Sequence, residues 1–169
     1  LVLTGMALSV GSFCEIVPNM IQGALTPKIE SVKPYTPLEL AGRDIYIREG
    51  CVNCHTQMIR TLRADTARYG EYTRPGECIY ERPFLWGSKR TGPDLARVGV
   101  GKLSGATGAL WHWAHMYNPQ ETSEGTVMPA YENIYRDDTD FAILGRKLEM
   151  LKLLGTPYSD ELIASAEEN

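Results

Sequence analysis

Five consecutive residues constrain the fold of this chain more than any other feature: Cys51, Val52, Asn53, Cys54 and His55. A C-x-x-C-H run is typical of covalent attachment of a c-type haem. The spacing suits this chemistry, because two thiols one turn apart reach the two vinyl groups of one porphyrin. The adjacent imidazole then lies beneath the iron as an axial ligand. The run therefore predicts one covalently bound haem c held by Cys51, Cys54 and His55.

Three other interpretations of the run compete with haem attachment. A redox-active C-x-x-C disulfide would need a thioredoxin-like βαβ setting, which the sequence does not show. A zinc site would need a second pair of ligands, and neither Cys14 nor Cys78 is paired with a nearby ligand. Chance occurrence is the third interpretation, but the run follows a helix with clear capping signals. We expect Cys14 and Cys78 to be free thiols.

A haem that only transfers electrons needs a second strong axial ligand, and methionine raises the potential relative to a second histidine. The candidates downstream of the run are Met58, Met116, Met128, Met150, His112 and His115. Met58 is too close to His55 to reach the opposite face of the haem, and Met150 lies in an expected helix. Met128 precedes a proline in a loop before the last expected helix, which favours it as the sixth ligand. His112 and His115 are expected to pack or to lie on a helix surface, and they remain the replacement ligands.

Further residues are candidates to support the haem. A backbone carbonyl at Gly92-Pro93 would accept the second ring N–H of His55 and fix its tautomer. An ordinary turn is the alternative, and the pairing with the haem run favours the role toward His55. The haem carboxylates need donors, and each candidate is otherwise a surface residue. The donors considered are Arg60, Arg63, Trp86, Lys89 and Arg90.

Residues 1–25 form the most apolar stretch of the chain, and Glu15 is their only charged residue. As a helix the stretch would be roughly 37 Å long, enough to cross a bilayer core. Because the chain begins with Leu1, this segment can be truncated at its start. A signal peptide and a buried core helix are the alternatives, and Glu15 and Pro18 weaken the interpretation as a plain anchor. We favour a membrane helix that packs against another subunit.

The rest of the chain reads as an all-α protein with long loops and no convincing strand. Residues 26–36 are proline-rich and predict an exposed linker, and residues 37–169 are expected to form a cytochrome c-like domain. Thr36 and Glu39 provide an N-cap and a capping-box partner for a helix that runs into Cys51. The stretch 56–90 reads as mostly loop. Further helices are expected at about 106–117 and 139–154, the latter capped by Asp137 or Asp138.

Composition excludes some classes of protein. Charged residues make up 22% of the 169 residues and hydrophobic residues 43%, which is ordinary for a globular chain. The net charge of −4 argues against a nucleic-acid binder, which is usually basic. The chain also shows no nucleophile–base pair and no open metal site, so we expect no bond chemistry of its own.

Several runs resemble the mono-haem subunit of cbb-type (C-family) haem–copper cytochrome c oxidases. The resemblance covers essentially the whole chain. It is carried by GCVNCHTQMIR (50–60), RYGEY (68–72), RPFLWGSKRTGPDLARVG (82–99), MPAY (128–131) and LGTPY (154–158), together with EIVP (15–18), His112, His115 and Asn118-Pro119.

This resemblance implies a single membrane helix in the bacterial inner membrane, with the cytochrome c domain on the periplasmic side. It implies one haem c on Cys51 and Cys54, ligated by His55 and Met128. Electrons would arrive from a di-haem cytochrome c subunit or a soluble cytochrome c. They would pass to the low-spin haem b of the catalytic haem–copper subunit, which reduces oxygen and pumps protons. The chain itself would be a non-catalytic relay.

Other functions remain as alternatives. The small haem c subunit of a nitric oxide reductase shares the design of an anchor plus a haem domain, but it should lack the run at residues 86–99. A haem-based sensor or peroxidase would need an open iron position. A free-standing cytochrome c carrier would donate electrons without belonging to an oxidase.

Overall fold

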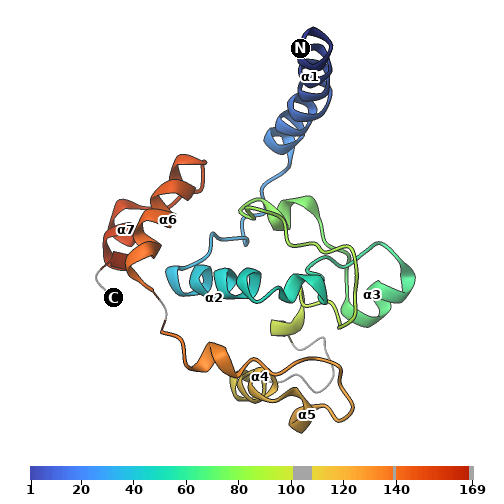
Figure 1. Cartoon of the computed structure of the whole chain (residues 1–169), viewed down its shortest axis with the longest axis vertical. Coiled ribbons are helices and arrows are strands. Elements are labelled where there is room, and N and C mark those ends of the chain that lie inside the picture. The colour runs from blue at the N-terminus through green and yellow to red at the C-terminus, as the bar shows by residue number, and fades with distance from the viewer. Residues whose placement is uncertain (101–107, 139, 168–169) are drawn as a thin grey trace. The chain divides into compact units, whose positions relative to one another are not determined.

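The computed structural model describes residues 1–100, 108–138 and 140–167, and these are helices joined by loops (Figure 1). No strand occurs in the described ranges, so the predicted all-α class is confirmed. The α-helices are α1 (Val2–Leu25), α2 (Pro37–Arg48), α3 (Arg63–Tyr69), α4 (Gly108–Tyr117), α5 (Pro119–Thr122), α6 (Ala142–Leu153) and α7 (Asp160–Glu167). The 3-10 turns are η1 (Cys51–Asn53), η2 (Pro75–Cys78), η3 (Val98–Val100) and η4 (Glu132–Tyr135).

The chain divides into two compact units, one of residues 1–33 and 74–81 and one of residues 34–73 and 82–169. In the first unit, α1 is long and apolar enough, from Val2 to Gln22, to cross a membrane, and it buries nothing against the rest of this unit. The segment 74–81 packs on the stretch after α1, where a Cβ on Gly76 would lie 2.5 Å from the Pro27 carbonyl oxygen. Cys14 is exposed and Cys78 is buried, and neither forms a disulfide bond within the described residues.

Helix α2 leads the chain to the C-x-x-C-H run. Its N-terminus has the predicted capping box: the Glu39 N–H donates to the Thr36 hydroxyl, and the Thr36 N–H donates to the Glu39 carboxylate at 2.8 Å. The expectation that this helix runs into Cys51 is wrong, because α2 ends at Arg48. Gly50 then adopts φ 71°, a left-handed conformation that favours glycine, and this turn starts η1.

The main apolar core of the second unit joins α2, α6 and α7. Its buried members are Leu40, Ala41, Leu144, Leu148, Tyr158, Ile163 and Ala166. Helix α6 begins at Ala142 rather than near 139, and residue 139 lies outside the described residues. Asp137 and Asp138 therefore do not cap this helix; Asp137 makes an ion pair with Arg48 at 3.4 Å.

Three α-helices were not predicted: α3, the four-residue α5 and α7. Helix α3 falls within the stretch expected to be mostly loop, and no side-chain hydrogen bond caps it among the described residues. Helix α7 follows Ser159, whose hydroxyl accepts a hydrogen bond from the Leu162 N–H at 3.2 Å. That serine, followed by two acidic residues and an apolar run, is an N-cap signal that could have revealed α7.

Helix α4 matches the expectation at its C-terminal end, where it stops at Tyr117 before Asn118-Pro119. The expected start near residue 106 lies outside the described residues, and the described helix begins at Gly108. The short helix α5 follows, and the chain then turns back so that the Tyr131 N–H donates to the Met116 carbonyl at 2.9 Å.

Candidate functional site

The 3-10 turn η1 brings the C-x-x-C-H residues together. The Cys54 N–H and the His55 N–H both donate to the Cys51 carbonyl, at 3.2 and 2.9 Å. This turn places the two cysteines one turn apart, as the run predicts for attachment to one porphyrin edge. Cys54 is exposed, Cys51 is half-buried, and both thiols are free in the described structure. Burial raises the pKa of the Cys51 thiol, and the nearby Glu49 and Cys54 raise it further.

The His55 imidazole is oriented by one backbone carbonyl. Its Nδ1 lies 2.8 Å from the carbonyl oxygen of Pro93, the contact that the sequence predicted for this proline. A carbonyl only accepts hydrogen bonds, so we assign the ring proton to Nδ1. The Nε2 lone pair is then available to a metal, which is the arrangement that iron ligation requires.

Gly92 allows the loop to lie directly against this imidazole. A Cβ built on Gly92 would lie 2.3 Å from His55 Cε1 and 2.7 Å from Nδ1. The N–H groups of Thr91 and Gly92 both donate to the Cys54 carbonyl, at 2.9 and 2.8 Å. Two consecutive residues just before Pro93 are therefore hydrogen-bonded to the C-x-x-C-H run.

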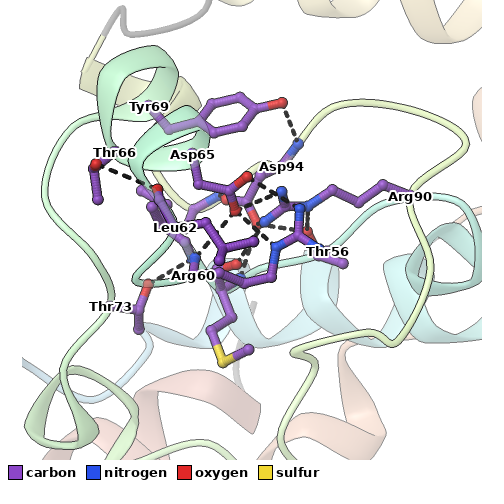
Figure 2. Close-up of polar contacts among 12 residues, drawn as sticks. Thr56, Arg60, Leu62, Asp65, Thr66, Tyr69, Thr73, Arg90 and Asp94 are labelled. Carbon is purple, nitrogen blue, oxygen red and sulfur yellow. Dashed lines mark hydrogen bonds and ion pairs between the residues drawn. The ribbon is translucent and has the colours of Figure 1, made fainter.

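Arg90 and Asp94, which flank residues 91–93 in the sequence, belong to a buried group of charged side chains (Figure 2). Arg90 is at its centre, with a side chain only 14% exposed. It donates to four acceptors among the described residues: the Thr56 hydroxyl, the Asp65 carboxylate, the Met58 carbonyl and the Asp94 carboxylate. Since a guanidinium has five N–H groups, one is left for any other acceptor. Arg90 is one of the predicted donors to haem carboxylates, but most of its N–H groups are already hydrogen-bonded to protein acceptors.

Asp94 is the most deeply buried acid of this group, at 1% exposure. Its carboxylate accepts hydrogen bonds from the Thr56 hydroxyl at 2.5 Å and from the Met58 N–H at 3.0 Å. Arg90 supplies the positive charge at 3.2 Å. Buried charges are costly unless they are paired and hydrogen-bonded, and both conditions are met here.

Asp65 joins α3 to the same group. The Arg60 guanidinium donates to both oxygens of this carboxylate, at 2.9 and 3.0 Å, and Arg90 donates at 2.6 Å. The hydrogen bonds from Arg60 and then Arg90 hold the pKa of the Asp65 carboxyl well below its usual range, against the opposing effect of burial. Arg60, predicted as a haem carboxylate partner, is thus paired with Asp65, and its side chain is half exposed.

Met128 lies in the loop between α5 and η4, where it is half-buried. Its N–H donates to the Thr126 hydroxyl at 3.2 Å. Gln120 braces the same loop: its side-chain oxygen accepts from the Gly125 N–H at 3.2 Å, and its amide group donates to the Thr126 carbonyl. The loop that carries the predicted sixth ligand is thus internally hydrogen-bonded.

The aromatic residues of α4 pack on one another. The His115 ring stacks on Trp111 with centroids 4.5 Å apart, and its Nδ1 lies 2.5 Å from the Thr122 hydroxyl. Burial lowers the pKa of His115, and electrostatic interactions with His112 and His55 lower it further. His112 lies edge-on to Trp111. Trp86, the other predicted haem partner, stacks on Phe84 at 4.4 Å.

Tyr46 on α2 reveals a further feature of the site. Its hydroxyl oxygen is buried and has no hydrogen-bond partner within the described residues. Burial raises the pKa of Tyr46 to about 12; Cys51 and Asp94 raise it a little further, and the nearby Gln57 side chain lowers it. Among the described residues, two thiols one turn apart and an imidazole whose Nε2 is available fit a c-type haem.

Sequence reasoning missed most of the buried group. From the sequence, no role was assigned to Asp65 or Tyr46, and Asp94 occurred only within the run at residues 82–99. The acidic residues carry no local pattern that marks them as buried. Their nearby partners, Arg60 for Asp65 and Arg90 for Asp94, form pairs like those on a surface, and the Arg90–Asp65 contact that joins the two pairs spans 25 positions.

The model of one protein family matches residues 1–169, the whole chain; its description is cytochrome c oxidase, mono-heme subunit/FixO. The chain belongs to this family. The resemblance drawn from the sequence motifs is thereby confirmed. Members of the FixO family are subunits of an oxidoreductase complex, and the mono-haem description agrees with the single C-x-x-C-H run. No curated protein matches the chain in sequence.

Proposed function

We propose that the chain is the electron-relay subunit of a cbb-type terminal oxidase, with one haem c attached through Cys51 and Cys54. His55 and Met128 are the proposed axial ligands. The observation that carries this proposal is the His55–Pro93 contact of 2.8 Å, because it makes Nε2 available within an attachment motif. Membership of a family of mono-haem oxidase subunits supports the same conclusion.

When bound, the haem supplies an iron that takes up and releases one electron. The protein residues hold it and set its potential. Cys51 and Cys54 anchor the porphyrin edge, His55 is oriented by Pro93, and the Met128 sulfur favours a higher potential than a second histidine would. With both axial positions filled by side chains, the chain has no open position for oxygen, which suits a relay.

The remaining parts of the proposal concern location and partners. Helix α1 anchors the chain in the bacterial inner membrane, and the haem domain lies on the periplasmic side, where haem attachment takes place. Electrons come from a di-haem cytochrome c subunit or a soluble cytochrome c. They go to the haem b of the catalytic haem–copper subunit. The exposed apolar length of α1 and the family membership support this arrangement.

The ligand assignment is tested in the purified oxidase complex. Met128→Ala should abolish the sulfur–iron charge-transfer band of the oxidised haem c, because the sulfur is the sixth ligand. Met150→Ala, on α6 and 58% exposed, is the matched control and should leave the band unchanged. A Met128→Ala variant with an intact band would show that Met128 is not a ligand.

The attachment is tested by haem staining on a denaturing gel. Cys54→Ala should leave at most one thioether bond and poor assembly of the complex. Binding of carbon monoxide to the reduced chain would reveal an open iron position and favour a sensor or peroxidase. Co-purification with a copper-containing subunit supports the oxidase, and a non-haem-iron partner would indicate a nitric oxide reductase.

A further inference from the structure

The peptide unit between Pro93 and Asp94 is hydrogen-bonded at both of its ends. Its carbonyl oxygen lies 2.8 Å from His55 Nδ1, and its N–H donates to the Tyr69 hydroxyl at 3.3 Å (Figure 2). This peptide bond is trans. In a planar trans peptide the C=O and the N–H point in opposite directions. The Tyr69 hydroxyl therefore holds one end of the same rigid group whose other end orients the imidazole.

Tyr69 is well placed to orient this peptide. Its side chain is 4% exposed, at the C-terminal end of α3. Two guanidinium groups lie near its ring, that of Arg68 at 5.1 Å and that of Arg90 at 5.5 Å from the centroid. Burial and these cation–π contacts restrict the ring, so the position of the hydroxyl is defined.

The Asp94 side chain also helps to fix the Pro93–Asp94 peptide in place. Its carboxylate accepts from Thr56, which directly follows His55, and from Arg90. The peptide can therefore tilt only if several buried hydrogen bonds break. The Tyr69 hydroxyl is the one contact in this group made to the peptide N–H itself.

A hydrogen bond at the N–H also changes the electronic character of the carbonyl. Hydrogen bonds in a chain polarise one another, so the Pro93 oxygen becomes a better acceptor. A stronger bond from Nδ1–H makes the imidazole a more basic ligand. A more basic axial ligand stabilises the oxidised iron relative to the reduced iron.

We propose that Tyr69 is a positioning residue for the axial ligand His55, acting through the Pro93–Asp94 peptide, and that its hydroxyl lowers the haem potential. This rests on the proposed function in one respect, namely that His55 ligates the iron. Tyr69 itself contacts neither the haem iron nor the ligand. Its effect is transmitted through one peptide unit and one hydrogen bond.

The test is Tyr69→Phe in the full chain, purified within the oxidase complex. An optical redox titration of the haem c band should show a higher midpoint potential than in the wild type. At a fixed ambient potential the ferrous-to-ferric ratio should rise about two- to fivefold, as expected for loss of one net hydrogen bond. Tyr72→Phe, on an exposed tyrosine three residues further on, should leave the potential unchanged.

A merely structural role predicts a different result. It would reduce haem content or stability without moving the potential of the molecules that remain folded. If Tyr69→Phe fails to assemble, 3-fluorotyrosine placed at position 69 keeps the ring and a hydroxyl that accepts more weakly. It should give a smaller rise in potential. Electron paramagnetic resonance of the ferric haem should show altered g-values in both variants.

The outcomes separate the inference from the proposed function. A wild-type chain without covalent haem, or without His55 ligation, would overturn both. A wild type with haem and an intact methionine band, together with variants of unchanged potential, would overturn only the role of Tyr69.

Discussion

Gly92 shows how the lack of a side chain shapes the site at the scale of a single residue. The His55 ring occupies the volume that a side chain at this position would need. Without that close approach, the Pro93 carbonyl would not lie 2.8 Å from Nδ1. One glycine thus lets the loop at residues 91–93 pack on the predicted axial ligand, and the adjacent proline orients it.

Gly92→Ala should displace either the imidazole or the loop. The added Cβ would lie 2.3 Å from His55 Cε1, so one of them must move. We expect a loss of about 1–3 kcal/mol of stability, as for other overpacked sites, and a perturbed haem spectrum. Denaturant unfolding and the optical spectrum of the purified complex measure the two effects.

The control for this substitution is Gly99→Ala. A Cβ on Gly99 meets no atom of the described residues within 4 Å, so stability and spectrum should change little. Equal behaviour of the two alanine variants would contradict the packing of His55 against Gly92.

At the scale of secondary-structure elements, α2 and α3 are stabilised in different ways. Helix α2 has its capping box within four residues of sequence, and this signal predicted its start. Helix α3 has seven residues and no side-chain cap among the described contacts. Short helices are marginal alone, so tertiary contacts must hold α3. Asp65 supplies them through Arg60 and Arg90.

Asp65→Asn should weaken α3 and the site behind His55. The two arginines lose their shared charged partner, and we expect a loss of about 1.5–3 kcal/mol at neutral pH. Because the folded state depresses the pKa of Asp65, its contribution is complete above the unfolded pKa of about 4. The contribution is lost as the pH falls from there toward the folded-state pKa.

The measurement is urea unfolding as a function of pH. The difference between wild type and Asp65→Asn should narrow below about pH 4. Asp138→Asn removes an exposed acid and serves as the matched control. A difference that stays constant down to low pH would show that the charge of Asp65 is not what stabilises α3.

At the scale of the whole molecule, the chain combines an apolar helix with a unit built for a cofactor. Helix α1 has 24 residues, which is roughly 36 Å of helix and matches a bilayer core. Its apolar side chains are exposed throughout, including Phe13 at 70%. Exposed apolar surface of this extent is typical of contact with lipid or with another membrane helix.

Val10→Lys tests the membrane role of α1. A lysine near the centre of a spanning helix costs about 2.5–3.5 kcal/mol of insertion free energy. The fraction of the chain that resists carbonate extraction from membranes should therefore fall. Leu38→Lys, on an exposed position of α2, should extract like the wild type. If the wild type itself is released by carbonate, α1 does not anchor the chain.

Local patterns in the sequence determined several features: the C-x-x-C-H run, the capping box of α2, a helix near residues 139–154 and the long apolar helix at the start. Each depends on residues within a few positions of one another, so a periodic pattern or a motif carries it. The contact between His55 and Pro93 was also predicted from the sequence, because a Gly-Pro segment occurs together with the C-x-x-C-H run. The ligand role of Met128 and the haem contacts of Arg60 and Trp86 stay predictions.

The tertiary structure alone decided which charges are buried together. Arg90 meets Asp65 and Thr56 across 25 and 34 positions of chain, and Tyr69 meets the Asp94 N–H across 25. No local pattern distinguishes these residues from ordinary surface charges or a core tyrosine. These groups can be buried only because folding brings distant segments together and forms hydrogen bonds between them. The physical reason is that desolvation penalises each group separately, while the hydrogen bonds that offset it exist only in the folded chain.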